Sequence, residues 1–214
     1  MRPRRVLESQ EVGPGIFRIR IERRNDVFKA GRHVAVGLPS GFTKPYSLCS
    51  SETDPYLEIL VKRVSDGRVS VQLSDLRPKD AVQVNPPRGS FTLETAAAHE
   101  RILLVATGTG IAPFRSFWRT HPDWNWTLVH GSREAQGDLA AEFANTARRV
   151  FCVSGPEVPQ GAFGGRVTDW IRSFPAHSYD RAYLCGNTKM IIEAIPLLAE
   201  RGLDLSQIYS ELYF

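Results

Sequence analysis

The chain has 214 residues, of which 42% are hydrophobic and 23% charged, and its formal net charge is +4. This composition is ordinary for a globular protein, and the length allows one large domain or two small ones. It excludes several classes, because no apolar stretch is long enough for a membrane span, no dense Lys/Arg block with interleaved aromatics marks a nucleic-acid-binding surface, and three cysteines without paired spacing do not form a disulfide framework.

The N-terminal part of the chain reads as short strands separated by Gly, Pro, Asn and Asp. Residues 16–21 alternate apolar and basic side chains, which is the period of a half-buried strand. Further strands are predicted over residues 33–36, 46–48, 57–61 and 81–84, and one short helix over residues 69–76. Short strands with frequent turns favour an antiparallel barrel or sandwich, which we assign to residues 1–95.

Beyond a linker at residues 96–100, strands alternate with helices. Strands are predicted over residues 101–106, 127–130, 150–153, 182–185 and 208–213. The predicted helices are one that follows a glycine-rich turn and runs through Trp118, and those over residues 139–149, 166–172 and 190–200. This alternation predicts a parallel five-stranded α/β domain over residues 99–214, with a ligand crevice at the carboxyl ends of its strands.

The glycine-rich turn Thr107-Gly108-Thr109-Gly110-Ile111-Ala112-Pro113 lies directly between a buried strand and a helix. Such a turn presents backbone N–H groups and a helix dipole to an anion or a carboxamide, and glycine lets the backbone approach a ligand closely. No Gly-Lys-Ser/Thr follows, so it is not a P-loop, and Pro113 replaces the third glycine of a full dinucleotide fingerprint. A purely structural turn is the alternative.

Two other strand ends carry candidate residues. Cys185-Gly186-Asn187 closes a strand at the same predicted sheet edge, although a lone cysteine is more often a small buried hydrophobic residue. Ser132 and Arg133 end another strand and either bind a phosphate or cap the next segment.

The barrel half contributes two further motifs. Lys44-Pro45-Tyr46-Ser47 places a cation, an aromatic ring and a hydroxyl on one strand, with Lys44 and Tyr46 on the same face. The segment Gly67-Arg68-Val69-Ser70 opens the short helix and is a candidate anion site.

In this order, the two barrel motifs, the glycine-rich turn, Cys185-Gly186-Asn187 and the C-terminal Glu211-Leu212-Tyr213-Phe214 resemble the ferredoxin–NADP reductase family. The resemblance runs from about Val6 to Phe214, and the glycine turn together with Cys185-Gly186-Asn187 is its most specific part. It implies a flavoprotein that holds FAD on the barrel and NADP(H) on the α/β domain, and that needs no metal.

On the barrel, the resemblance implies that Tyr46 packs on the flavin ring and that Ser47 hydrogen-bonds flavin N5. Lys44 stands where the family has an arginine facing the pyrophosphate, and lysine keeps the charge but loses the bidentate fork. The other implied FAD-binding residues are Pro45, Leu60, Val61, Lys62, Gly67, Val69 and Ser70.

On the second domain, the resemblance implies that the glycine turn and Gly186 and Asn187 shape the nicotinamide and pyrophosphate pocket. Cys185 would lie close to nicotinamide C4, and Glu211 matches a carboxylate implicated in proton handling near N5. Either Tyr213 or Phe214 would cover the flavin. Hydride then passes from nicotinamide C4 to flavin N5, with the protein supplying orientation and electrostatics.

The choice between NADP and NAD depends on contacts to the 2′-phosphate. Ser132, Arg133 and Arg166 stand at the family's phosphate contacts, which favours NADPH. The segment Ser154-Gly155-Pro156-Glu157 lacks the arginine that many NADP-specific relatives have there, so NAD stays open.

The predicted partner is a mobile, acidic one-electron carrier, a ferredoxin or a flavodoxin, because three scattered cysteines cannot hold an iron–sulfur cluster. The basic N-terminus lacks the apolar run of a secretory signal, so we predict a cytoplasmic protein. One alternative is the reductase component of an oxygenase or another redox complex. A second is a non-catalytic flavin- or nucleotide-binding subunit, which would not need Ser47, Cys185 and Glu211.

Overall fold

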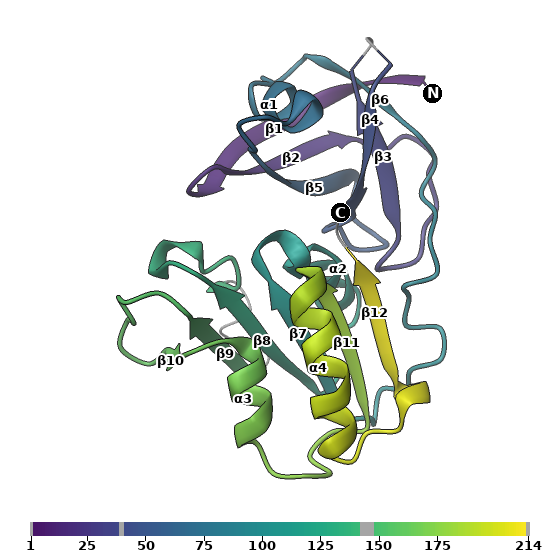
Figure 1. The fold of residues 1–214 in the computed structure, drawn as a ribbon. Helices are drawn as coiled ribbons and strands as arrows, with labels where there is room; N and C mark the ends of the chain where they lie inside the picture. Colours follow the sequence, from purple (N-terminus) through teal and green to yellow (C-terminus); the bar gives the residue numbers. More distant parts are fainter. Residues whose placement is uncertain (1, 39–40, 142–147, 213–214) are drawn as a thin grey trace. The chain divides into compact units, whose positions relative to one another are not determined.

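The computed structural model describes residues 2–38, 41–141 and 148–212. By its internal contacts the chain divides into two compact units, one formed by residues 1–93 together with 112–120 and the other by residues 94–111 together with 121–214. Each is built around its own hydrophobic core. The first unit is all-β apart from its helices, and the second is a parallel α/β unit (Figure 1).

The first unit is an antiparallel barrel with the strand order β4-β3-β6-β1-β2-β5. Its two end strands meet where Leu48 bridges Ile59 and the Cys49 N–H donates to the Glu58 carbonyl at 2.7 Å, so the predicted barrel is confirmed. Its strands are β1 (Arg2–Gly13), β2 (Ile16–Glu22), β3 (His33–Gly37), β4 (Thr43–Ser47), β5 (Tyr56–Lys62) and β6 (Ala81–Val84), and its short helix is α1 (Arg68–Ser74).

The N-terminal strand β1 is absent from the sequence prediction. It is long, carries five charged residues among its 12, and is interrupted by irregularities between Val6 and Glu8 and between Glu11 and Gly13. Each irregularity shifts the alternation by which a half-buried strand is identified in a sequence.

Helix α2 (Ala112–Thr120) packs with the barrel strands, although it directly follows the glycine-rich turn in the chain. Its first six residues are buried, and the rings of Phe114 and Phe117 lie 6.2 Å and 5.8 Å from that of Phe91. The Ser116 hydroxyl donates to the Ser50 carbonyl at 2.6 Å. The helix is therefore held by both apolar and polar contacts within the barrel unit.

The second unit has a parallel sheet with the strand order β10-β9-β8-β7-β11-β12. The predicted parallel sheet is confirmed, but it has six strands rather than five, because the two-residue β10 joins its edge. The elements are β7 (Ile102–Thr107), η1 (Gly108–Ile111), β8 (Trp126–Ser132), η2 (Ala135–Gly137), β9 (Arg148–Val153), β10 (Phe163–Gly164), α3 (Val167–Ser173), β11 (Arg181–Gly186), α4 (Thr188–Glu200), η4 (Leu205–Gln207) and β12 (Ile208–Leu212).

The helix predicted over residues 139–149 is wrong at both of its described ends. Leu139 and Ala140 lie in a turn, where the Asp138 carboxylate accepts the Ala140 N–H at 3.0 Å. Arg148 and Arg149 already belong to β9. Asp138 therefore closes the turn by its own hydrogen bond, as short polar side chains commonly do outside helices.

The strand order reverses beside β7, whose neighbours are β8 on one side and β11 on the other. In open α/β sheets such a reversal opens a crevice at the carboxyl ends of the strands, where ligands bind. Among the residues that the structure describes, no helix is both long and apolar enough to cross a membrane.

Candidate functional site

The glycine-rich turn lies at the strand reversal, at the carboxyl end of β7. Gly108 has φ of +54°, and a Cβ built on it would meet nothing within 4 Å. Its left-handed backbone therefore faces open space. A Cβ on Gly110 would instead lie 2.3 Å from the Cys185 carbonyl oxygen and 2.6 Å from the Gly186 Cα. The turn is thus open on one side and packed against the end of β11 on the other, which fits a backbone cradle for a phosphate or carboxamide.

The end of β11 is tied to β7 by hydrogen bonding. The Asn187 N–H donates to the Thr107 Oγ1 at 2.9 Å, and Gly186 has φ of +128°, with no room for a Cβ against Thr107. The Asn187 side chain caps α4 by accepting the N–H groups of Lys189 and Met190 at 2.9 Å and 3.3 Å. Asn187 therefore has a structural role in this unit, because it connects the end of β11 to the end of β7 and caps α4.

Two predicted catalytic residues are brought together by the register of three strands. Cys185 pairs with Ala106 of β7 on one side and with Glu211 of β12 on the other. Cys185 is fully buried and Glu211 is half-buried. The third, Ser47, lies in the barrel unit, and Tyr213 and Phe214 lie outside the described residues.

His130, near the carboxyl end of β8, is part of this site and was not among the predicted site residues. Its Nε2 lies 3.0 Å from the Gly108 carbonyl oxygen, and its ring stacks on Phe151 at 5.9 Å. The side chain is fully buried, and burial lowers the pKa of His130. The signal in the sequence was a polar residue following Thr127-Leu128-Val129 in a strand that is otherwise buried.

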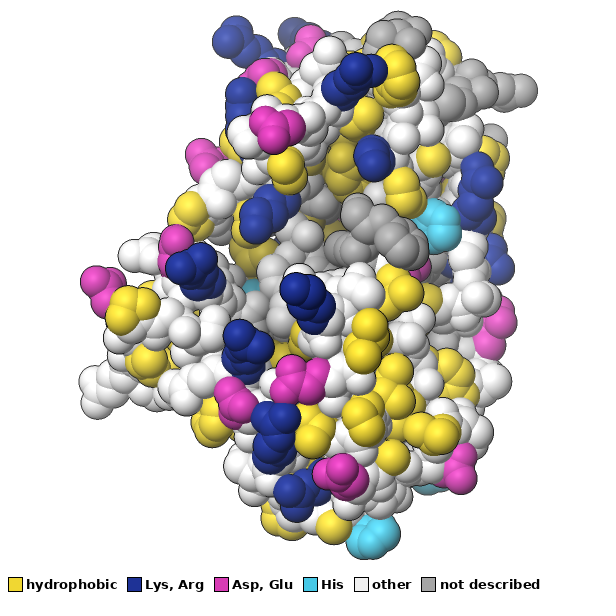
Figure 2. Space-filling model, viewed as in Figure 1, with side chains coloured by type: hydrophobic (Ala, Val, Ile, Leu, Met, Phe, Trp, Pro, Cys, Tyr) yellow, Lys and Arg dark blue, Asp and Glu magenta, His cyan; other side chains and the backbone are white. Residues whose placement is uncertain are grey.

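Ser132, Arg133 and Arg166 gather at the carboxyl ends of β8 and β9. Ser132 pairs with Val153, whose carbonyl accepts the Gly165 N–H at 2.9 Å, so the loop before α3 returns to the end of β9. Arg133 and Arg166 are both exposed. Figure 2 shows Lys and Arg side chains interspersed with Asp and Glu side chains on the face of the α/β unit that carries α3. This corner of the sheet therefore offers cations to an anion.

The motif Lys44-Pro45-Tyr46-Ser47 forms most of β4 on the barrel. Lys44 and Pro45 are exposed, Tyr46 is partly buried against the barrel core, and Ser47 is buried. Burial raises the pKa of the Tyr46 hydroxyl to about 12, so the ring stays a neutral surface. An exposed cation beside a half-covered aromatic ring suits a ligand that combines a planar ring with phosphates.

The other predicted FAD-binding residues of the barrel differ in what they can offer a ligand. Val61 and Val69 belong to the barrel core, which leaves only their backbone groups for a ligand. Lys62 is exposed, and Leu60 is buried without belonging to that core. At the start of α1, the Ser70 hydroxyl accepts the Val64 N–H at 3.3 Å, and a Cβ on Gly67 would overlap that hydroxyl. Gly67 and Ser70 thus shape the loop that enters α1.

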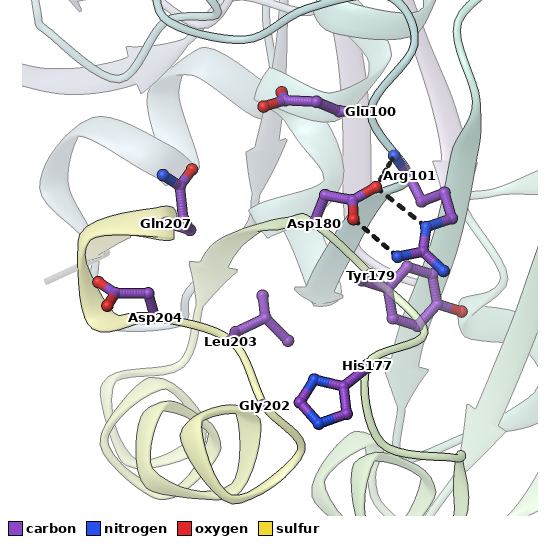
Figure 3. Close-up of a pocket in the computed structure, with 9 residues that line it drawn as sticks. All are labelled: Glu100, Arg101, His177, Tyr179, Asp180, Gly202, Leu203, Asp204 and Gln207. Atoms are coloured by element: carbon purple, nitrogen blue, oxygen red, sulfur yellow. Dashed lines mark hydrogen bonds and ion pairs between the residues drawn. The ribbon is translucent and has the colours of Figure 1, made fainter.

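A surface pocket of about 390 Å³ lies at the opposite end of the parallel sheet (Figure 3). Its lining includes Arg101, Asp180 and Asp204, which precede β7, β11 and β12. A six-residue strand spans about 20 Å, so this pocket is remote from the glycine turn. The Asp180 carboxylate accepts two hydrogen bonds from the Arg101 guanidinium, at 2.7 Å and 3.0 Å, and these bonds lower the pKa of Asp180 to about 2. Within this pocket the charges of Arg101 and Asp180 are therefore paired with each other.

Comparisons with known proteins agree with this geometry. Residues 6–93 match the model of the oxidoreductase FAD-binding domain, and residues 104–194 match that of the oxidoreductase NAD-binding domain. One relative is the ferredoxin–NAD(P)(+) reductase component of the naphthalene 1,2-dioxygenase/salicylate 5-hydroxylase systems of a Ralstonia species. The chain is 30% identical to it over 225 residues, and the match covers 98% of this chain and 68% of the relative. It is 28% identical over 212 residues to the flavodoxin/ferredoxin–NADP reductase of Escherichia coli K12, covering 87% and 85%.

Solved structures share the fold. A ferredoxin NADP+ reductase from Neisseria gonorrhoeae with bound FAD and NADP matches with a TM-score of 0.89 and 21% identity, covering 100% of this chain and 98% of that one. The cytochrome P450 reductase GcoB from Amycolatopsis matches with a TM-score of 0.88 and 29% identity, covering 99% and 69%.

The chain belongs to the ferredoxin–NADP reductase family of FAD- and NAD(P)-binding oxidoreductases. The predictions of the family, the enzyme class and the cofactor pair are confirmed. The roles of single residues stay predictions.

Proposed function

We propose that this protein transfers hydride from NADPH to bound FAD and passes single electrons to a ferredoxin- or flavodoxin-type carrier. The observation that carries the proposal is the arrangement at the strand reversal, where the open backbone of Gly108 and the ends of β11 and β12 form one site. The cofactors supply the hydride and one-electron chemistry. The residues of this chain would bind and orient the cofactors and exclude water from the site.

On the α/β unit, the first N–H groups of the turn after Thr107 would hold the dinucleotide, because a helix start leaves its first N–H groups without intrahelical partners. Cys185 would form an apolar floor beside the nicotinamide. Glu211, one strand away in register, would hold or move a proton near the reacting atoms. Gly186 and Asn187 would fix the edge of this pocket by their contacts to Thr107.

On the barrel, Tyr46 would present its ring to the flavin, and Ser47 would donate to the flavin N5. Lys44 and the loop formed by Gly67 and Ser70 would hold the pyrophosphate from two sides. We assign this FAD-binding domain to residues 1–95 and the nucleotide domain to residues 99–214.

The first expected result is that the purified protein binds FAD and that NADPH bleaches the flavin absorbance without oxygen. NADPH should give the higher kcat/KM of the two nicotinamide cofactors. Protein that takes up no FAD, or whose flavin stays oxidised with both cofactors, would contradict the proposal. Equal or better turnover with NADH would overturn only the choice of cofactor.

Preference for NADPH is assigned to the exposed Arg133 and Arg166, with Ser132 beside them. A hydrogen bond to a charged group contributes about 1.5–3 kcal/mol. Replacing Arg133 with alanine should therefore raise the KM for NADPH by about 10- to 100-fold and leave that for NADH nearly unchanged. The matched control is Arg172→Ala, because Arg172 lies in the last turn of α3 and is held by Asp169 and Glu193. Equal losses with both cofactors would contradict the assignment.

A net charge of +4 suits an acidic carrier, whose association would then weaken with added salt. The Ralstonia relative favours a second candidate function, that of a reductase component of an oxygenase system. Reoxidation of the reduced flavin by a panel of ferredoxins, flavodoxins and oxygenase components separates the two. We also propose a cytoplasmic location, supported by three cysteines that form no disulfide.

A further inference from the structure

We propose that His130 is a positioning residue for dinucleotide binding, holding the Gly108–Thr109 peptide so that the Thr109 N–H faces the ligand. The inference rests on the proposed function of the glycine turn. It adds a residue that lies beneath the turn rather than in it.

The contact itself settles which atom donates. The Nε2 of His130 lies 3.0 Å from the Gly108 carbonyl oxygen, and a carbonyl oxygen only accepts, so Nε2 carries the proton. Nδ1 is buried and has no hydrogen-bond partner among the described residues. A proton on Nδ1 would therefore be a buried charge without a partner, which is costly. The ring is the neutral Nε2–H tautomer.

The surroundings keep that tautomer in place. His130 pairs in register with Ala106 of β7 and Phe151 of β9, and the Phe151 ring covers one of its faces. The charged groups that bear on it are Asp138 and Arg149, which form an ion pair with each other at 3.0 Å. The imidazole is therefore a fixed donor in a buried, nearly neutral setting.

The geometry of the peptide bond links the His130 contact to ligand binding. In a trans peptide the C=O and the following N–H point in opposite directions. Anchoring the Gly108 carbonyl on His130 therefore directs the Thr109 N–H away from the sheet interior. Gly108 has φ of +54° and open space beside it, so the hydrogen bond from His130 holds this peptide from below, in addition to the hydrogen bonds within the 3-10 helix η1 itself. Without the bond from His130, the peptide can tilt and withdraw the N–H.

The test uses three substitutions in the FAD-loaded protein. His130→Phe keeps an aromatic ring beside Phe151 but has no donor. His130→Gln places an amide N–H at nearly the reach of Nε2, whereas His130→Asn has a similar amide that is too short. Dissociation constants for NADP+ are measured by calorimetry, with FAD content and flavin absorbance as checks of folding.

We expect His130→Phe and His130→Asn to weaken NADP+ binding by about three- to tenfold, the scale of one lost hydrogen bond, and His130→Gln to restore most of it. Unchanged binding in His130→Phe, or a glutamine variant as weak as the asparagine one, would overturn the inference. Failure of the wild-type protein itself to bind NADP+ would overturn the proposed function, and the inference with it.

A second measurement needs no variant. Nitrogen-15 NMR of the wild-type imidazole should show a protonated Nε2 and a bare Nδ1, and the Thr109 amide signal should shift when NADP+ is added. A ring protonated only at Nδ1 would overturn the inference, because Nε2 could not then donate to Gly108.

Discussion

Replacing Glu58 with alanine should lower the free energy of unfolding of the barrel unit by about 3–5 kcal/mol, the scale of breaking a buried ion pair by removing one partner. Glu58 lies on β5 and is fully buried. Its carboxylate accepts hydrogen bonds from Arg20 at 2.8 Å and from Arg119 at 3.1 Å. Arg115 and Arg18 lie within 3.5 Å and 3.9 Å of it.

The size of the effect follows from the arginines that remain. Arg115 is itself buried, and Arg18, Arg20 and Arg119 are each less than a third exposed. Glu8 would still pair with Arg18 and Arg20, and Asp54 with Arg119. Without the buried carboxylate at their centre, however, the four guanidinium groups would repel one another in a poorly hydrated space. Two of the four come from α2, so the same change should also loosen this helix from the barrel.

Thermal unfolding at a fixed excess of FAD would measure the change, because bound FAD adds stability by mass action. A loss of 3–5 kcal/mol corresponds to a fall in Tm of about 6–20 °C for a chain of this size. The control is Glu22→Ala, because Glu22 also lies on a barrel strand and pairs with an arginine, Arg24, but at the surface. Its cost should stay below about 1 kcal/mol. Equal Tm values for the two variants would show that the Glu58 cluster does not hold the barrel together.

The two cases in which the sequence prediction fails most clearly, β1 and the segment around residue 139, share a physical cause. The strands of the parallel sheet are continuous apolar runs, such as Ile102–Thr107. Because such strands are buried on both faces, their own residues are enough to identify them in the sequence. Strand β1 is stabilised by pairing with β2 and β6 rather than by its own pattern. Around residue 139, the sequence has a helical pattern, but Asp138 instead closes a turn by its hydrogen bond to the Ala140 N–H and forms an ion pair with Arg149.

The candidate site likewise has a part that the sequence predicts and a part that it does not. Motifs at the ends of strands could be predicted, because parallel strands bring their carboxyl ends to one edge whatever their spacing in the sequence. The supporting contacts could not. Arg119 and Glu58 are 61 residues apart, and the contact of His130 with Gly108 spans 22 residues. Each needs the folded register before the two residues can be identified as partners.

The packing of Gly110 against β11 is another contact of this kind, and it leads to the largest expected effect on activity. Replacing Gly110 with alanine should slow flavin reduction by NADPH about 100-fold, because a displacement of about 1 Å at a reacting centre costs that much. The new Cβ would lie 2.3 Å from the Cys185 carbonyl oxygen and 2.6 Å from the Gly186 Cα. Both are backbone atoms of β11, so no side chain can rotate to make room.

Stopped-flow reduction would show whether the loss is confined to the nucleotide step. FAD content and chemical reduction of the flavin by dithionite should stay as in the wild type, since the residues predicted to hold FAD on the barrel lie in the other unit. The overpacking itself should cost about 1–3 kcal/mol of stability. The matched control is Gly161→Ala, in the same unit, where φ is +84° and nothing lies within 4 Å of the new Cβ. That variant should lose about 1–2 kcal/mol through backbone strain but keep its reduction rate. If Gly110→Ala reduced the flavin as fast as Gly161→Ala, the close packing of the turn on β11 would have no part in placing the nicotinamide.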